Sequence, residues 1–298
     1  MAYDLGPIRH LYPFESHYIE LGGPRMHYVD SGRGPAVVML HGNPTWSFYY
    51  RDLIRGLCDE CRVIAPDHVG CGLSDKPQDY PYALATHIDN LERLIDHLGL
   101  DQITLAMHDW GGAIGCGFAV RQPQRVRRLI VFNTAAFPGR TPLRIRACRL
   151  PIFGPIAVRR LNAFARTAAW MACKNRSRMT PDVRAGYLLP YDSRANRVAI
   201  LRFVQDIPAG SSHPTYPLIR SIEAGLTELR DRPMLICWGM RDFCFTARFL
   251  DGWIERFPEA EVHRFAEAGH YVVEDAAEAI LPLVRGFLRS KVDISART

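Results

Sequence analysis

One stretch limits what this 298-residue chain can fold into: an apolar run that ends in a polar residue and two glycines. Residues 103–107 are almost entirely apolar, which predicts a buried strand. Asp109 follows, and after Gly111 and Gly112 the sequence from 113 to 120 is compatible with a helix. The glycines allow the helix to pack close to the strand and allow a strained backbone at the turn. We therefore predict a strand that turns sharply into a helix, with Asp109 at the apex.

Strand and helix patterns alternate on both sides of this turn, which predicts an α/β fold with a mostly parallel central sheet. The expected strands are residues 18–21, 26–29, 37–40, 62–65, 103–107, 128–132, 234–238 and 261–265, and the expected helices include 47–57, 85–98 and 276–288. The alternation stops between about residues 138 and 228, where prolines and helical patterns dominate. The predicted organisation is a core of residues 1–137 and 229–298 with an inserted helical cap, residues 138–228.

The composition argues against a membrane-spanning, secreted or zinc-binding protein. With 48% hydrophobic and 23% charged residues, it is that of an ordinary globular protein. No apolar stretch has the length of a transmembrane helix, and residues 1–10 do not resemble a secretory signal. Cys58 and Cys61 have no second pair to complete a zinc site, and most of the eight cysteines lie in apolar contexts. We expect reduced thiols, a cytoplasmic location, and neither a metal nor an organic cofactor.

Two more polar residues follow strands that the pattern places in the same sheet. Asp242 comes after the strand 234–238, and His270 comes after the strand 261–265. The carboxyl ends of parallel strands meet at one edge, so Asp109, Asp242 and His270 are expected to converge there. The order nucleophile, acid, histidine is that of the α/β-hydrolase triad, whose nucleophile stands on such a strand-to-helix turn. Alone, Asp109 could be a helix cap and His270 a surface-loop histidine; together they predict an enzyme.

In this arrangement Asp109 is the nucleophile and forms a covalent ester with a saturated carbon or an opened ring. His270 orients and deprotonates water, and Asp242 holds the tautomer of His270 and stabilises its charged form.

Three motifs resemble the haloalkane dehalogenase family: residues 41–46 (HGNPTW), 108–112 (HDWGG) and 269–270 (GH). The resemblance extends from about residue 11 to residue 288. One branch of that family carries its acid after the strand that precedes the cap, where this chain has Asn133. An amide cannot act as an acid, so Asp242 remains the candidate.

The resemblance also implies roles for two donors beside the nucleophile. Asp109 displaces a leaving group by SN2 attack, while N–H groups of Trp110 and Asn43 bind the departing anion. Both are uncharged donors that can stabilise an anion in a dry pocket. His270 is then the base and Asp242 its partner.

Finer similarities point to a subgroup. Residues 133–138, 190–197 and 202–208, together with His108, resemble the β-lactone decarboxylases of bacterial long-chain olefin biosynthesis. The implied reaction opens the four-membered ring of a cis-3-alkyl-4-alkyl β-lactone (oxetan-2-one) with Asp109 and releases carbon dioxide and a cis-alkene. His108 is either an accessory to this chemistry or a residue that fills space beside the turn.

Three alternatives remain open. The first is haloalkane hydrolysis, which needs the same oriented carboxylate, anion donors and apolar pocket. The second is epoxide hydrolysis, which also needs two cap tyrosines; Tyr187, Tyr191 and Tyr216 are available. The third is a ligand receptor without activity.

The expected cap is strongly basic. No Asp or Glu occurs between Trp110 and Pro181, whereas this stretch contains Arg121, Arg125, Arg127, Arg128, Arg140, Arg144, Arg146, Arg149, Arg159, Arg160, Arg166, Lys174, Arg176 and Arg178. This is either a solvated basic face or a docking surface for olefin-pathway proteins or an anionic surface. Nucleic acid is not expected, because no motif that reads it is present. Apolar residues between 156 and 171 recur at helical spacing and predict one amphipathic helix. We expect Trp170 to pack in the core; the alternative, by resemblance to another branch of the family, is a halide ligand in the cap.

Overall fold

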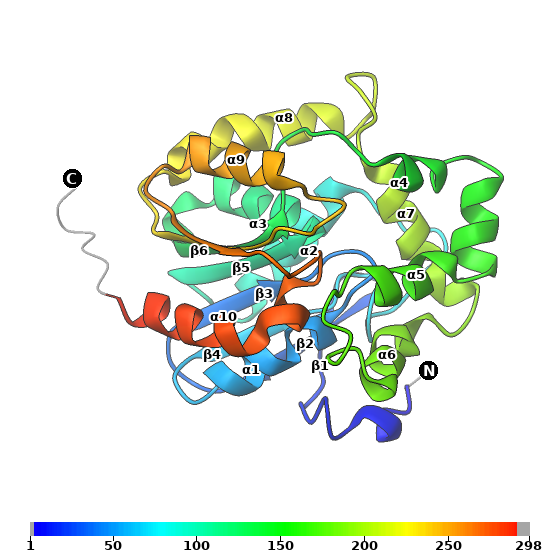
Figure 1. Ribbon diagram of the computed structural model, residues 1–298, viewed down its shortest axis with the longest axis horizontal. Coiled ribbons are helices and arrows are strands. Elements are labelled where there is room, and N and C mark those ends of the chain that lie inside the picture. Colours follow the sequence, from blue (N-terminus) through cyan, green and yellow to red (C-terminus); the bar gives the residue numbers. More distant parts are fainter. Residues whose placement is uncertain (1–2, 291–298) are drawn as a thin grey trace.

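A computed structural model describes residues 3–290 and is built on an eight-stranded sheet (Figure 1). The strands are β1 (His17–Glu20), β2 (Arg25–Ser31), β3 (Ala36–Leu40), β4 (Arg62–Pro66), β5 (Ile103–Asp109), β6 (Val126–Thr134), β7 (Met234–Gly239) and β8 (Glu261–Phe265). They lie in the order β1-β2-β4-β3-β5-β6-β7-β8. Only the pairings of β2, with β1 and with β4, are antiparallel. The predicted α/β class with a mostly parallel sheet is confirmed.

Helices cover both faces of the sheet. They are α1 (Arg51–Leu57), α2 (Leu84–His97), α3 (Trp110–Arg121), α4 (Leu143–Ala147), α5 (Ala163–Met171), α6 (Pro181–Leu188), α7 (Val198–Asp206), α8 (Tyr216–Gly225), α9 (Ala247–Arg256) and α10 (Val272–Arg289). In Figure 1, α1 and α10 lie on one face, and α2, α3, α8 and α9 lie on the other. Helices α4 to α7 stand to one side of the sheet, on the right of the view. Central strands are apolar because helices bury them from both sides.

Most predicted elements are found with small shifts of their ends, but α9 is an addition. Its buried Leu250 and Trp253 lie three residues apart on the face toward the core, a spacing that the sequence already carried. The division into a core and a cap stays a prediction. The last helix of the predicted cap, α8, packs against α3 of the core, where Gly117 and Gly225 let the two helices approach closely.

The prediction of one amphipathic helix over residues 156–171 is wrong. A π-helical turn (Pro155–Arg160) and α5 are separate, because Asn162 between them has a positive φ of 54° that no continuous helix accepts. Trp170 is 59% exposed, so its expected place in the core is also wrong. Among residues 3–290, no helix has both the length and the apolar character to cross a membrane.

Candidate active site

No residue separates β5 from α3, so the turn between them is very tight. β5 ends at Asp109 and α3 begins at Trp110, and Asp109 has a φ of 51°, which is strained for a residue with a side chain. A Cβ on Gly112 would lie 1.9 Å from the hydroxyl oxygen of Thr134, and one on Gly42 would lie 2.1 Å from Oδ1 of Asp109. Glycine is therefore required at both positions. The turn aims the Asp109 carboxylate away from the sheet.

Backbone N–H groups hold this carboxylate. The N–H of Asn43, just after β3, donates to Oδ1 of Asp109 at 2.7 Å, and the N–H of Trp110 also interacts with the carboxylate. Burial raises the pKa of Asp109, although nearby His270 and these two N–H groups oppose the shift. A buried carboxylate with few donors is a stronger nucleophile than a solvated one.

The structure brings Asp109, Asp242 and His270 together. Nδ1 of His270 lies 2.9 Å from Oδ2 of Asp242, and Nε2 of His270 lies 3.7 Å from Oδ2 of Asp109. Burial lowers the pKa of His270, but the charge of Asp242, the hydrogen bond to it and the charge of Asp109 outweigh burial and raise it overall. The gap of 3.7 Å is longer than a hydrogen bond, so Nε2 is free to act on a molecule between the two groups.

Asn133 has a place in the site that sequence reasoning did not foresee. Its Nδ2 donates to Oδ2 of Asp242 at 3.0 Å and to the carbonyl of Gly239 at 3.0 Å, and its Oδ1 accepts from the N–H of Gly239. The N–H of Cys244 donates to the other carboxylate oxygen of Asp242. Asn133 thus fixes the acid to β7 from the position where a family branch carries the acid itself. An amide at the end of β6 was the available signal.

His108 lies behind the triad. Its Nε2 is 2.9 Å from the carbonyl oxygen of His270, and its ring stacks on Tyr49 with centroids 4.4 Å apart. Burial and the neighbouring charge of His270 hold the pKa of His108 well below its usual range, so its ring is neutral and donates to that carbonyl. His108 forms no wall of the cavities beside Asp109. His108 was expected either to assist the chemistry or to fill space beside the turn. This geometry favours a structural role, in which His108 supports the His270 loop.

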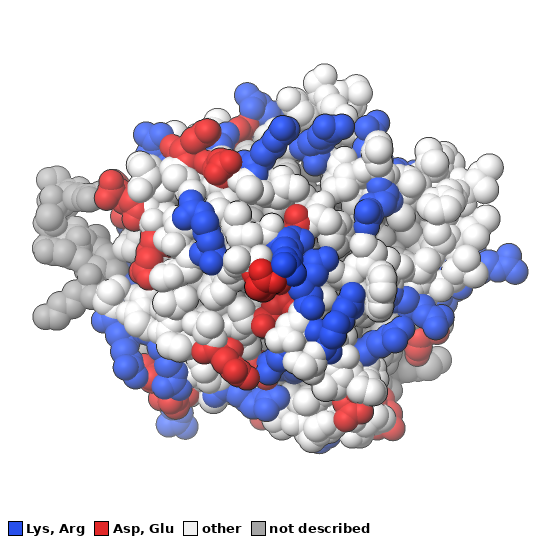
Figure 2. Space-filling model, in the orientation of Figure 1, with Lys and Arg blue, Asp and Glu red and all other residues white. Residues whose placement is uncertain are grey.

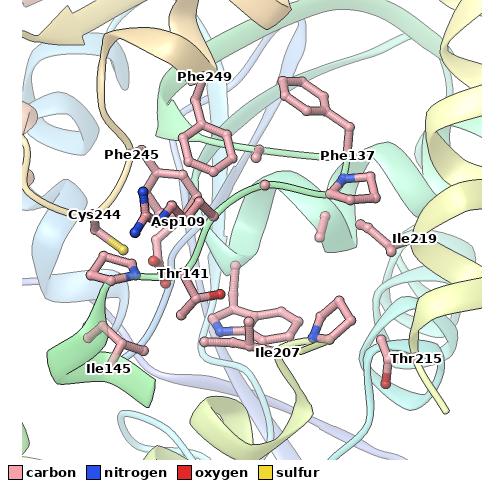
Figure 3. Close-up of a pocket in the computed structure, with 18 of the residues that line it drawn as sticks. Asp109, Phe137, Thr141, Ile145, Ile207, Thr215, Ile219, Cys244, Phe245 and Phe249 are labelled. Carbon is pink, nitrogen blue, oxygen red and sulfur yellow. The ribbon is translucent and has the colours of Figure 1, made fainter. Parts of the chain in front are cut away.

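Two apolar cavities meet at Asp109 and Trp110. The first has about 750 Å³ including its open mouth, and Phe137, Ile219 and Phe249 are among its walls. In Figure 3, Asp109 lies on one side of this cavity, with Ile219 and Thr215 on the opposite side.

The second cavity has about 450 Å³ and lies between the triad and the helices above it. Its walls include Asn43, Phe164, Ala168, Phe243 and His270. A substrate bound at Asp109 therefore has two apolar spaces available.

Trp110 and Asn43, the expected anion donors, both line the second cavity. Within residues 3–290, Nε1 of Trp110 has no hydrogen-bond partner. Nδ2 of Asn43 donates to the carbonyl of Ile200 at 3.1 Å, while its buried Oδ1 has no partner in the described part of the chain. The Nε1–H of Trp110 is thus free to bind an anion beside the nucleophile. The side-chain amide of Asn43 has one N–H left for the same purpose, because the other is donated to Ile200.

The three tyrosines considered for epoxide chemistry lie elsewhere. The hydroxyl of Tyr187 donates to Glu274, and that of Tyr191 donates to the carbonyl of Thr45. Neither they nor Tyr216 line the two cavities at Asp109. In the described residues there is also no group of three His, Cys, Asp or Glu that could hold a metal ion.

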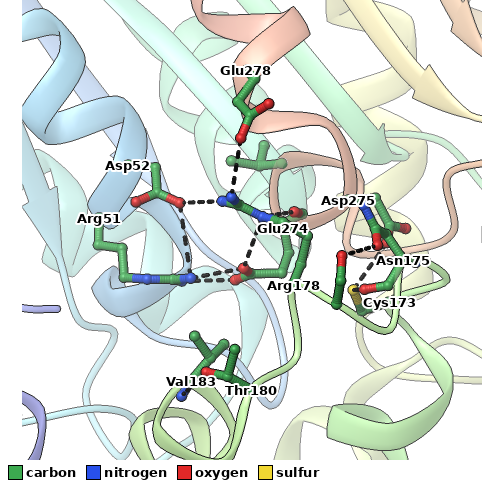
Figure 4. A network of polar contacts seen from close by, with 12 residues as sticks. Arg51, Asp52, Cys173, Asn175, Arg178, Thr180, Val183, Glu274, Asp275 and Glu278 are labelled. Carbon is green, nitrogen blue, oxygen red and sulfur yellow. Dashed lines mark hydrogen bonds and ion pairs between the residues drawn. The ribbon is translucent and has the colours of Figure 1, made fainter.

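A polar network in the first turn of α10 holds the His270 loop in place (Figure 4). Asp275 accepts hydrogen bonds from the N–H of Gly269 at 2.6 Å and from the N–H groups of Lys174 and Asn175 at 2.7 Å, so it ties this loop to the segment after α5. Next to it, Glu274 makes two hydrogen bonds of 2.7 Å with the guanidinium of Arg51.

We expect Glu274→Ala to lower the free energy of unfolding by about 3–5 kcal/mol, because it leaves the buried Arg51 charge without its partner. Glu278→Ala on the same helix is the control. Its carboxylate is almost fully exposed and lies 3.5 Å from Arg178, so the expected loss is about 0.5 kcal/mol or less. Urea unfolding followed by circular dichroism measures both. Equal losses would contradict the assignment of Glu274 as a structural anchor.

Comparisons with known proteins fit this geometry. A family model described as the alpha/beta hydrolase fold matches residues 35–153. A cis-3-alkyl-4-alkyloxetan-2-one decarboxylase of Shewanella oneidensis is 46% identical over 93% of this chain and 89% of that protein. The chain belongs to the family of these decarboxylases. Haloalkane dehalogenases are its further relatives: haloalkane dehalogenase 2 of Mycobacterium bovis is 33% identical over 94% of this chain and 97% of its own length. The crystal structure of an Agrobacterium tumefaciens haloalkane dehalogenase matches with a TM-score of 0.83 at 27% identity, covering 92% of this chain and 96% of that one.

Proposed function

We propose that this chain decarboxylates cis-3-alkyl-4-alkyl β-lactones to cis-alkenes and carbon dioxide. The observation that carries the proposal is the pair of apolar cavities that meet at Asp109. Such a lactone has alkyl chains on two adjacent ring carbons, and each cavity can take one chain. A simple haloalkane has one chain and needs only one cavity. The higher identity to the decarboxylase than to the dehalogenase supports the same assignment.

The reaction follows from the arrangement of donors around the nucleophile. Oδ2 of Asp109, which the Asn43 N–H does not hold, attacks the ring carbon bonded to the ring oxygen, and that C–O bond breaks. The released carboxylate is stabilised by Nε1–H of Trp110 and the amide of Asn43. The bond between this carboxylate and its carbon then breaks to form carbon dioxide. Its electrons form the C=C bond as the ester bond to Asp109 breaks.

This sequence of steps consumes no water and transfers no net proton, and Asp109 returns as a carboxylate. Inversion at the attacked carbon followed by anti elimination is a net syn loss, so a cis-lactone gives a cis-alkene. The lactone reaction therefore does not use His270 as a base. Haloalkane hydrolysis, the second candidate, needs His270 and Asp242 to activate water, and their 2.9 Å contact favours this capacity too.

The remaining assignments follow from the site and the surface. Epoxide hydrolysis is disfavoured, since the three candidate tyrosines do not line the cavities. A receptor without activity is disfavoured by the assembled triad. We place the enzyme in the cytoplasm, acting on a small apolar substrate without nucleic acid, and we assign the arginine-rich cap to association with olefin-pathway proteins or an anionic surface.

The test compares substrates on one purified preparation. A cis-dialkyl β-lactone, a β-lactone with one alkyl chain and 1-bromobutane are assayed for alkene, carbon dioxide and halide. The proposal predicts the highest kcat/KM for the dialkyl lactone and a large loss when one chain is removed. Rapid halide release without alkene formation would make the enzyme a dehalogenase.

The two reactions should also differ in pH dependence. Hydrolysis of the alkyl ester needs neutral His270, and the raised pKa of His270 keeps it protonated to higher pH. Halide turnover is therefore lost as pH falls through a value above the usual 6.5 or so of histidine. Lactone turnover needs only charged Asp109, so it falls at lower pH, shifted upward from the usual carboxylate range because burial raises the pKa of Asp109. Profiles of kcat that coincide for both substrates would contradict this account.

A further inference from the structure

The exposed apolar side chains of the molecule gather in one part of the chain. Of the large hydrophobic residues that face solvent within residues 3–290, all but Tyr18 lie between residues 143 and 170. Six of them form what we term the apolar ridge: Leu143, Leu150, Ile152, Phe153, Ile156 and Leu161. Leu143 and Ile152 are 74% and 78% exposed. Exposed large apolar side chains that gather in one short segment of a globular protein point to a binding face rather than to ordinary surface variation.

Arginines surround the ridge. One hollow is lined by Arg160, Arg166 and Arg184 next to Leu161 of the ridge. Asp192 is the one acid among its lining residues, and Nδ2 of Asn196 donates to it. The hollow thus presents an excess of positive charge beside an apolar side chain.

A second hollow is lined by Arg146, Arg149 and Arg202 next to Leu150 of the ridge. Within residues 3–290, none of Arg146, Arg149 or Arg160 forms an ion pair with a carboxylate. Figure 2 shows uncharged surface at the upper right, where α4 lies in Figure 1, with Lys and Arg beside it. An excess of positive charge over local acids attracts an anionic surface.

The ridge adjoins the mouth of the substrate cavity. Arg140, Pro142 and Ile145 line the first cavity at Asp109, while Leu143 and Arg144 of the same segment face solvent. A body that covers the ridge therefore also lies at the entrance to the active site.

We propose that the apolar ridge and its arginine hollows dock on an anionic phospholipid bilayer, with the cavity mouth at the lipid surface. Apolar side chains enter the interface while arginines bind lipid phosphates, which is the chemistry of a peripheral membrane face. An acidic protein would match the charge but leave Ile152 and Phe153 without apolar partners. The inference deepens the proposed function, because long alkyl chains dissolve in a bilayer, from which substrate enters and product leaves. Vesicle binding without substrate tests it separately from the reaction.

The experiment is flotation of the full chain with vesicles of phosphatidylcholine alone or mixed equally with phosphatidylglycerol. We expect at least about tenfold stronger binding to the anionic vesicles, weakened by salt. The double variant Ile152→Ser, Phe153→Ser and the charge reversal Arg160→Glu, Arg166→Glu should each reduce this binding about tenfold or more. Matched controls are Tyr18→Ser, an exposed aromatic outside the cap, and Arg33→Glu, an exposed arginine before β3.

Loss of binding in the ridge and arginine variants, with unchanged binding in both controls, supports the proposal. Equal binding to both vesicle types, no binding to either, or equal losses in the controls would overturn it. Self-association of the wild type that the ridge variant abolishes, without vesicle binding, would instead assign the ridge to a second copy of this chain. Lactone turnover in detergent-free solution should stay unchanged in every variant, so a failed docking test and a failed activity test remain distinguishable.

Discussion

Replacement of Asp109 by alanine is expected to reduce lactone turnover by about 10⁵-fold, the scale of loss when a covalent nucleophile is removed. The carboxylate sits at the apex of the turn between β5 and α3, where the two cavities meet. Asp109 is the one carboxylate among the described residues that line these cavities, and nearby Asp242 is engaged by His270, Asn133 and the N–H of Cys244. Alkene formation by gas chromatography measures the loss.

Folding must be separated from chemistry in this experiment. Asp109 adopts a positive φ and is held by the Asn43 N–H, so alanine at this position removes a buried hydrogen bond as well as the nucleophile. Asp109→Asn is the matched variant: it keeps size and polarity but cannot form the ester. Asp109→Asn should unfold near the wild-type urea midpoint, and both variants should lack activity. Substantial lactone turnover by folded Asp109→Asn would contradict covalent catalysis.

Replacement of His270 by glutamine is expected to separate the two candidate reactions. Haloalkane turnover should stop after one halide per enzyme, because a general base worth about 10²–10⁴-fold is lost and the alkyl ester on Asp109 cannot be hydrolysed. Lactone turnover, which needs no water, should fall by about tenfold or less when measured well above the pKa of Asp109. The readouts are the halide burst and the mass of the alkylated enzyme.

The matched control is Asp242→Asn. It removes the charge that raises the pKa of His270, while the Cys244 N–H can still donate to the remaining amide oxygen. It should slow halide turnover more than lactone turnover. Loss of both activities to the same extent in His270→Gln would show that the lactone reaction passes through a water-dependent step.

The positions of residues that directly follow strands could be predicted from the sequence, because the predicted sheet determines where its strands end. A parallel sheet brings the carboxyl ends of β5, β7 and β8 to one edge, so Asp109, Asp242 and His270 were expected to converge, and the structure brings them together. β5 and β7 are short, mostly apolar runs buried along their whole length, the pattern that is easiest to recognise, whereas β8 is a partly exposed strand at the edge of the sheet.

Contacts between distant segments could not be predicted in the same way. The bond from Asn133 to Asp242 spans 109 residues, and that from Arg51 to Glu274 spans 223. Neither has a local pattern, since each depends on how helices and strands pack. The break at Asn162 was missed for another reason: apolar spacing on both sides is helical, and only a left-handed residue in the middle interrupts it. Ile156 and Leu161, which precede this break, are exposed and belong to the apolar ridge.

The most direct test of the central claim is a product balance from one cis-dialkyl β-lactone with the wild-type enzyme, beside Asp109→Ala. The account predicts one cis-alkene for each lactone consumed, no β-hydroxy acid above the background of spontaneous hydrolysis, and no alkene from the variant. A β-hydroxy acid as the main enzymatic product, or a trans-alkene, would contradict ring opening by Asp109 followed by loss of carbon dioxide.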